Sequence, residues 1–165
     1  MFDVEIDPSL SKAERYLVLV TSLRSLLDDE PDALANLANA AGLLFHSLEA
    51  INWCGFYLLR GEDLVLGPFQ GKPACVRIPV GKGVCGASAR DRATVVVPDV
   101  SRFPGHITCD PASRSEIVVP ILEADVLRGV LDVDAPEVGR FDGEDLAGLE
   151  KFVRELTPHV AWGRL

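Results

Sequence analysis

The spacing of apolar residues changes from helical to alternating near residue 51, and this change constrains the fold more than any other feature. Before it, Ser11 and Glu14 form the pattern of a capping box at a helix start. Pro31 suits the first turn of a second helix. One apolar face per helix follows, at Tyr16, Val20, Leu23 and Leu27 and then at Leu34, Leu37, Ala41, Leu44 and Leu48. We expect both faces to pack on a sheet.

Alternating apolar and polar residues after residue 51 predict a series of strands. The expected strands are residues 51–59, 64–69, 75–79, 94–97, 117–122 and 128–134, with a short helix over 83–90. A last helix begins after Asp142 and ends near Thr157, because Pro158 would interrupt it. This order predicts a single domain over residues 1–165, of the α+β class. Its central antiparallel sheet should carry helices on one face and ligand-covering loops on the other.

Charge and cysteine usage exclude several classes of protein. A formal net charge of −9 argues against a nucleic-acid partner, since phosphate binding requires a basic surface. Residues 1–8 lack the pattern of a signal peptide, and no apolar run approaches the roughly 20 residues of a membrane span. We therefore expect a cytoplasmic protein without membrane contact, whose four cysteines stay reduced. Their spacing contains no C-x-x-C, which argues against zinc-ribbon and thioredoxin motifs.

Two of the cysteines can be placed from local sequence. Alternation along residues 51–59 puts Trp53 and Tyr57 on one strand face and Cys54 on the opposite face, with the core. Cys85 lies in a glycine-rich turn, GKGVCG at 81–86, which matches a dinucleotide-binding pattern. The segment after this turn is too short for the crossover helix of such a unit. We expect Cys85 instead in the first turn of a short helix, where the pKa of a thiol falls.

Three acids occupy positions where a strand gives little structural reason for them. Glu116 begins one apolar run, and Asp132 and Asp134 share a face of another. Aspartate is depleted in strands, and two carboxylates about 7 Å apart along one strand repel and raise a pKa. The alternative to a functional role is a purely structural one, in which these acids form ion pairs with Arg114 and Arg128. An irregular loop over residues 101–114, of a length typical of functional loops, precedes them.

Several motifs together resemble the free methionine-(R)-sulfoxide reductases, which are stand-alone GAF-domain enzymes. The motifs are NWCGFY at 52–57, LGPFQGKPAC at 66–75, GVCG at 83–86, HITCD at 106–110, SRSEIVVP at 113–120 and GVLDVD at 129–134. The likeness covers nearly the whole chain, and three spaced cysteines with paired aspartates make it specific. Cys54 departs from the family, which usually has a small or apolar residue there.

The resemblance implies reduction of free methionine-(R)-sulfoxide, with thioredoxin as the reductant and no metal or organic cofactor. It implies Cys109 as the nucleophile, Cys75 as the resolving thiol and Cys85 as a third thiol. It also implies that the carboxylates bind the substrate ammonium and supply a proton, and that two aromatic residues form a pocket wall. These residues are Glu116, Asp132 and Asp134 for the carboxylates, and Trp53 and Tyr57 for the wall.

Alternatives remain open from the sequence. The expected helix terminus favours Cys85 as the nucleophile, whereas only Arg102 and Arg114 would activate Cys109. A non-enzymatic GAF sensor of a small molecule is a second function. A structural zinc site formed by Cys75, Cys85, Cys109 and His106 is a third. The oligomeric state is also open, with a homodimer among the alternatives.

Overall fold

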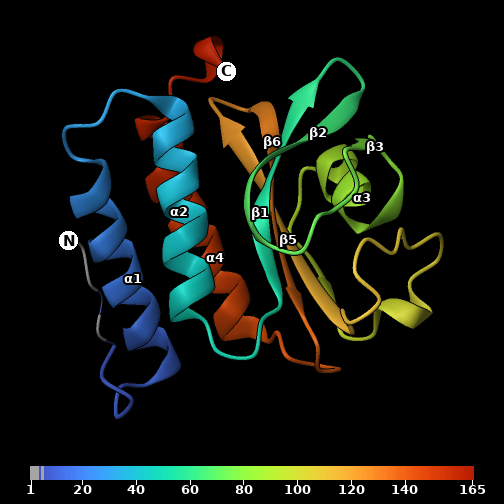
Figure 1. The fold of residues 1–165 in the computed structure, drawn as a ribbon, viewed down its shortest axis with the longest axis horizontal. Coiled ribbons are helices and arrows are strands. Elements are labelled where there is room, and N and C mark those ends of the chain that lie inside the picture. The colour runs from blue at the N-terminus through green and yellow to red at the C-terminus, as the bar shows by residue number, and fades with distance from the viewer. Residues whose placement is uncertain (1–3, 5) are drawn as a thin grey trace.

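The computed structural model describes residue 4 and residues 6–165, and it shows a sheet between two unlike layers (Figure 1). In this part of the chain the sheet has six strands: β1 (Trp53–Arg60), β2 (Asp63–Gly71), β3 (Arg77–Pro79), β4 (Val95–Val97), β5 (Ser115–Glu123) and β6 (Val126–Ala135). Their order is β3-β2-β1-β6-β5-β4, and every neighbouring pair is antiparallel. The predicted α+β class and the antiparallel sheet are confirmed.

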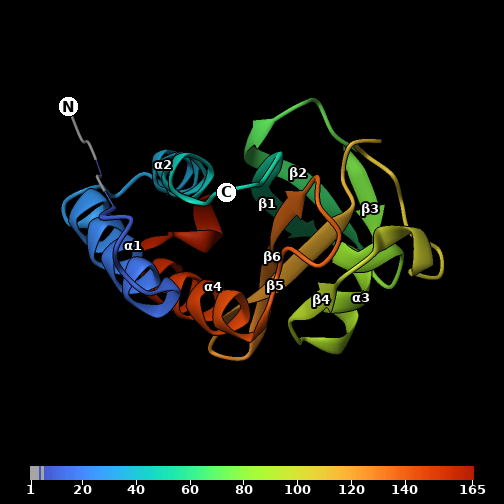
Figure 2. The ribbon, with the colours of Figure 1, turned by 90° about the horizontal axis from the view of Figure 1, so that it is seen from below.

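Three long helices cover one face of the sheet. They are α1 (Lys12–Leu27), α2 (Ala33–Ser47) and α4 (Gly143–Leu156). Helices α2 and α4 lie against the strands, and α1 packs on them from outside (Figure 2). Among the described residues, none of these helices is both long enough and apolar enough to cross a membrane.

The helix boundaries largely follow the capping residues. Ser11 caps α1 with the expected capping box to Glu14, and Asp142 caps α4 in the same way. In α2 the cap is Asp32, so Pro31 lies just before the helix rather than in its first turn. Leu34 was expected to face inward, but 59% of it is exposed. The prediction was wrong there because the buried face of α2 passes through Ala33 and Leu37 instead.

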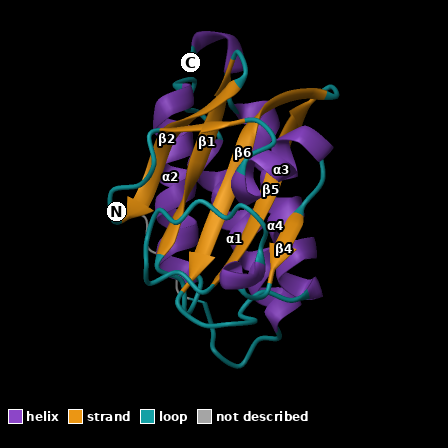
Figure 3. Cartoon of the chain, turned by 90° about the vertical axis from the view of Figure 1, so that its right-hand side faces the viewer, coloured by secondary structure: helices purple, strands orange, loops and turns teal. Residues whose placement is uncertain are grey.

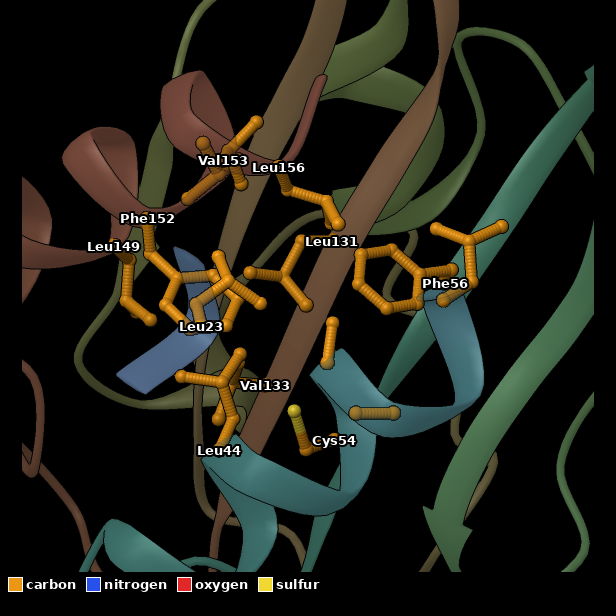
Figure 4. Packing of buried hydrophobic residues seen from close by; sticks show 14 of the residues in the cluster. Leu23, Leu44, Cys54, Phe56, Leu131, Val133, Leu149, Phe152, Val153 and Leu156 are labelled. Carbon is orange, nitrogen blue, oxygen red and sulfur yellow. The ribbon is translucent and has the colours of Figure 1, made fainter. Parts of the chain in front are cut away.

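The main apolar core lies between these helices and the sheet. Figure 4 shows Cys54 and Phe56 of β1 and Leu131 and Val133 of β6 meeting leucines of the helices. Cys54 is fully buried there, as its place in the strand predicted. Burial raises the pKa of its thiol well above the ordinary value. This cysteine is therefore an inert part of the core.

The opposite face carries a short helix, α3 (Gly83–Asp91), together with irregular loops (Figure 3). The prediction of helices on one face only was incomplete, because α3 packs on β5 and β6 from the loop side. Cys75 was expected in a strand, but β3 spans only Arg77–Pro79 and Cys75 lies in the loop before it. The residues that follow the cysteine pair with β2 only from Arg77 onward.

The glycine-rich turn leads into α3 without forming a dinucleotide-binding unit. The strands before and after it, β3 and β4, lie at opposite edges of the sheet. Gly83 has a φ of +62°, and a Cβ on Gly86 would lie 2.6 Å from the Pro79 carbonyl oxygen. Both glycines thus allow a tight turn against β3. The rejection of the dinucleotide interpretation is confirmed.

Candidate active site

A small cavity lies between α3, residues 106–113 and the strands β5 and β6. Its volume is about 20 Å³, which holds one or two water molecules. The lining side chains come from four segments of the chain that are distant in sequence. They are Ile78, Gly83, Val84, Cys85, His106, Ile107, Cys109, Asp110, Ser113, Glu116, Asp132 and Asp134.

Strand register brings the three predicted acids together on this cavity. Glu116 of β5 is the direct partner of Asp134 of β6, and Val118 is the partner of Asp132. Residues two apart on a strand point to the same side, so all three carboxyl groups face the loop layer. Their exposed fractions are only 6%, 7% and 9% for Glu116, Asp132 and Asp134. The expectation that Glu116 approaches the aspartate pair is confirmed.

No arginine or lysine neutralises these acids within the described part of the chain. Among the described residues one basic side chain, His106, approaches Glu116, with Nε2 3.4 Å from Glu116 Oε2. Desolvation lowers the pKa of this histidine and favours its neutral form. Arg128 instead forms an ion pair with Glu123, with Nη2 2.6 Å from Oε2, so it does not neutralise the cavity acids. In the described residues, no ion pair joins Arg114 or Arg128 to these acids. The purely structural interpretation of the acids therefore finds no support there.

Burial raises the pKa of all three acids well above ordinary values. Repulsion between the carboxylates is the next cause, from Asp134 on Glu116, from Glu116 on Asp132 and from Asp132 on Asp134. Both causes favour the protonated forms of these acids, and a proton held by the cluster near neutral pH stays a prediction. Such a carboxylic acid can act as a general acid.

Cys85 lies in the first turn of α3, as predicted, with its Sγ 3.9 Å from Glu116 Oε1. The helix terminus was expected to lower the pKa of this thiol, and that prediction was wrong. Burial raises the pKa of Cys85 well above the ordinary value, and the facing carboxylates of Asp132 and Glu116 raise it further. Desolvation and like charge outweigh the partial charge of the helix terminus.

Cys109 reaches the cavity from the loop and lies beside Cys75. Burial raises the pKa of Cys109 to about 12, and the neighbouring Cys75 thiol is the second cause. Arg102 does not activate it, because that side chain pairs with Asp99 at 3.4 Å. Both cysteines are half-buried and reduced. The two thiols thus lie side by side, and both are partly exposed to solvent. A dithiol–disulfide exchange requires this arrangement.

A polar clasp, which the sequence reasoning missed, joins the loops that carry these two cysteines. We define it as Asn52, Lys72, Asp110 and Ser113. Lys72 Nζ donates to Asp110 Oδ1 at 3.3 Å, and Asn52 Nδ2 donates to Asp110 Oδ2 at 3.3 Å and to Ser113 Oγ at 3.0 Å. Asp110 is buried and follows Cys109 directly, while Lys72 lies three residues before Cys75. No local pattern marks the clasp in the sequence, because Asn52 and Ser113 are 61 positions apart.

Trp53 and Tyr57 lie beneath the loop that carries Cys75. Their rings are stacked with centroids 5.9 Å apart, and both side chains are buried. The Tyr57 hydroxyl donates to the Cys75 carbonyl at 2.9 Å, and Trp53 Nε1 donates to the Lys72 carbonyl at 3.1 Å. Both residues thus support the loop in this conformation, and their role as a wall for substrate stays a prediction.

A group of potential metal ligands also lies in the cavity. One donor atom each from Cys85, Glu116 and Asp132 lie within 4.8 Å of one another. The alternative zinc set of Cys75, Cys85, Cys109 and His106 does not gather as a group of ligands among the described residues. The zinc site considered from the sequence combined three cysteines with a histidine, whereas the fold places Cys85 beside the acids.

Comparisons with known proteins give a consistent result. The GAF domain family model matches residues 18–157. The chain is 49% identical over 152 residues to the free methionine-R-sulfoxide reductase of Escherichia coli, covering 92% of each chain. The free methionine-R-sulfoxide reductase from Neisseria meningitidis, solved with its substrate, has a TM-score of 0.93 and 40% identity, over 99% of this chain and 98% of that one. The fRMsr of Staphylococcus aureus, also in complex with substrate, has a TM-score of 0.85 and 48% identity, over 96% and 100%.

Proposed function

Because the chain belongs to the free methionine-R-sulfoxide reductases, a family of GAF-domain proteins, we propose that it is an oxidoreductase acting on free L-methionine-(R)-sulfoxide. The observation that carries this proposal is that Cys85, Cys109 and three buried acids without a lysine or arginine partner among the described residues line one cavity, with Cys75 beside Cys109. The acids can bind the ammonium group of an amino acid, and the thiols can supply the two electrons of a reduction. We propose a single domain over residues 1–165.

Reduction begins when the Cys109 sulfur attacks the sulfoxide sulfur. The thiol proton passes to a carboxylate, and a protonated carboxyl group of the cluster, with Asp134 as our choice, protonates the sulfoxide oxygen. The attack joins Cys109 Sγ to the substrate sulfur. The hydroxyl group then passes to Cys109 Sγ as this sulfur–sulfur bond and the sulfur–oxygen bond of the substrate break, so methionine leaves and Cys109 becomes a sulfenic acid. The sulfoxide sulfur gains two electrons, and Cys109 loses two.

The sulfenic acid is then resolved by a second thiol. Cys75 lies beside Cys109, so its sulfur displaces water and forms a disulfide between the two. The dithiol of thioredoxin reduces this disulfide and returns both cysteines to thiols. Cys85, on the other side of the cavity, is a third thiol that can exchange with this pair. A cycle that begins from free thiols requires a reducing compartment, and we therefore place the protein in the cytoplasm.

Substrate binding requires a more open cavity than the one described. A volume of about 20 Å³ is far too small for an amino acid. Residues 106–113 form much of the wall, so we propose that this loop moves outward to admit the substrate. Glu116 and Asp132 then hold the ammonium group, while Trp53 and Tyr57 contact the methyl and thioether end.

The test supplies four substrates to the reduced protein with dithiothreitol or thioredoxin. They are the free R and S sulfoxides and the same two diastereomers within a peptide, and chromatography measures the methionine formed. We expect turnover of the free R form alone. Equal activity on the peptide-bound sulfoxide would overturn the proposal. Ligand binding without turnover would favour a non-enzymatic sensor.

Variants of the cysteines test the assigned roles. Cys109→Ser should release no methionine, whereas Cys75→Ser should release about one methionine per chain and then fail with thioredoxin. Cys54→Ala is the matched control, because this thiol lies in the core on the other side of the sheet. If Cys85→Ser alone abolishes the first methionine, Cys85 rather than Cys109 is the nucleophile.

A further inference from the structure

The cavity contains a set of metal-binding donors whose spacing approaches that of a tetrahedral ion. The donor atoms of Cys85, Glu116 and Asp132 all lie within 4.8 Å of one another. Cys85 Sγ is 3.9 Å from Glu116 Oε1, and His106 Nε2 is 3.4 Å from Glu116 Oε2. Ligands at the bond lengths of zinc lie about 3.3–3.8 Å apart around a tetrahedron. Small movements of Cys85, Glu116 and Asp132 would therefore bring three ligands to these distances. His106 approaches Glu116 alone, so its ring must turn toward the ion to complete the tetrahedron.

The types of donor agree with this geometry. Sulfur, imidazole nitrogen and carboxylate oxygen are the three ligand types that zinc takes in proteins. Calcium and magnesium prefer oxygen alone, so a thiol among the donors argues against them. The set thus favours a borderline-soft divalent ion over the hard cations.

The charge and volume of the cavity also suit one cation. Asp132 Oδ1 is buried and accepts no hydrogen bond from any described residue. The three acids have no lysine or arginine partner in the same part of the chain, and His106 is the basic side chain that approaches them there. A volume of about 20 Å³ accepts a single ion or water molecule but excludes an amino acid. An ion could therefore occupy the closed cavity without displacing the loop.

We propose that the closed, reduced protein binds one Zn²⁺ ion through Cys85, Glu116, Asp132 and His106. Binding releases the thiol proton of Cys85, because a metal-bound cysteine is a thiolate. The bound ion occupies the carboxylates to which we assign the substrate ammonium, so it excludes substrate and shields Cys85 from oxidation. This site goes beyond the proposed reductase activity, and its test requires no turnover.

The experiment titrates the reduced, metal-free full chain with Co²⁺, which reports ligand type by its absorption spectrum. We expect one Co²⁺ per chain, a near-ultraviolet thiolate-to-cobalt band and the visible bands of tetrahedral cobalt. Zn²⁺ should abolish these bands, and competition with a chelating dye should give a zinc dissociation constant in the micromolar range or tighter. If saturating Co²⁺ produces no thiolate-to-cobalt band, the proposal is overturned.

Variants separate this site from other thiol sites in the chain. Cys85→Ser should abolish the thiolate band, whereas the double variant Cys75→Ser/Cys109→Ser should keep it. Persistence of the band in Cys85→Ser, or its loss in the double variant, would contradict the assigned ligands. Asp132→Asn keeps the size of the side chain and should weaken zinc binding at least about tenfold. Circular dichroism of each variant checks folding, and Asp132→Asn tests the site should Cys85→Ser fail to fold.

Discussion

Buried acids lie on both sides of the sheet: Asp145 among the helices is neutralised by basic side chains, whereas the cavity cluster of Glu116, Asp132 and Asp134 is not. Asp145 of α4 accepts from Lys12 Nζ at 2.8 Å, from Arg140 Nη1 at 3.1 Å and from the Tyr16 hydroxyl at 2.8 Å. Glu116, Asp132 and Asp134 have one histidine between them in the described chain. Buried charges that stabilise a fold are paired with opposite charges. An unpaired cluster of buried acids therefore indicates a ligand-binding site.

The largest expected effect on stability comes from breaking the neutralised cluster. Asp145→Ala should lower the free energy of unfolding by about 3 kcal/mol, because it leaves Arg140 without an acidic partner and removes one of the two acids that Lys12 contacts. This is the lower end of the usual range, since the Lys12 side chain is 32% exposed. Arg24→Ala removes the exposed pair with Glu155 and is the control, with an expected cost below about 1 kcal/mol. Urea unfolding measures both, and equal losses would contradict the distinction.

The cavity acids should show the reverse pattern of effects. Asp134→Asn should slow methionine release at least about 100-fold, because it removes the proton donor. Its free energy of unfolding at neutral pH should change little, since a neutral amide replaces a carboxyl group whose raised pKa favours the neutral form. Glu116→Gln and Asp132→Asn should weaken substrate binding as well. Glu123→Gln alters a partly exposed acid on β5 and is the control. Single-turnover rates near wild type for all three cavity variants would remove these acids from the mechanism.

The pH dependence of stability should differ in sign between the cavity acids and Asp142, the exposed acid that caps α4. The cavity acids have raised pKa values in the folded state, so above about pH 4 that state binds more protons than the unfolded state. Their contribution to stability therefore falls as pH rises toward the raised values. Asp142 behaves oppositely: its hydrogen bond from Lys12 lowers its pKa to about 2, so its contribution is lost as pH falls through that value.

Urea unfolding between about pH 4 and pH 8 tests this difference. The wild type should lose about 1–2 kcal/mol more than Asp132→Asn across that range, because the variant has one fewer acid to ionise in the cavity. Parallel stability curves for the two proteins would show that Asp132 ionises normally in the fold, against our account.

The smallest expected effect concerns the clasp between the two cysteine loops. Lys72→Met removes the exposed ion pair with Asp110, which contributes at most about 1 kcal/mol. The first methionine release should be unchanged, while disulfide formation should slow by about two- to fivefold. Lys72→Arg should restore the wild-type rate. Quenched-flow labelling of free thiols measures this step, and an unchanged rate in Lys72→Met would remove the clasp from our account.

Features set by local periodicity could be predicted from the sequence. Alternation placed Cys54 in the core and the aspartate pair together, and the capping patterns placed the starts of α1 and α4. Features set by tertiary contacts could not. The pKa of Cys85 is raised by burial and then by carboxylates 31 and 47 residues away, and Leu34 is exposed through the orientation of α2. The clasp joins residues up to 61 positions apart, so no local pattern indicated it.

One measurement tests the central claim, that thiol chemistry belongs to the cavity side of the sheet. The reduced protein is mixed with one equivalent of free methionine-(R)-sulfoxide without reductant, remaining thiols are blocked, and mass spectrometry maps every cysteine. We predict about one methionine per chain and a disulfide between Cys75 and Cys109, with Cys54 still a thiol that reacts only after unfolding. Release of methionine with Cys109 still reduced, or oxidation of Cys54, would contradict the account.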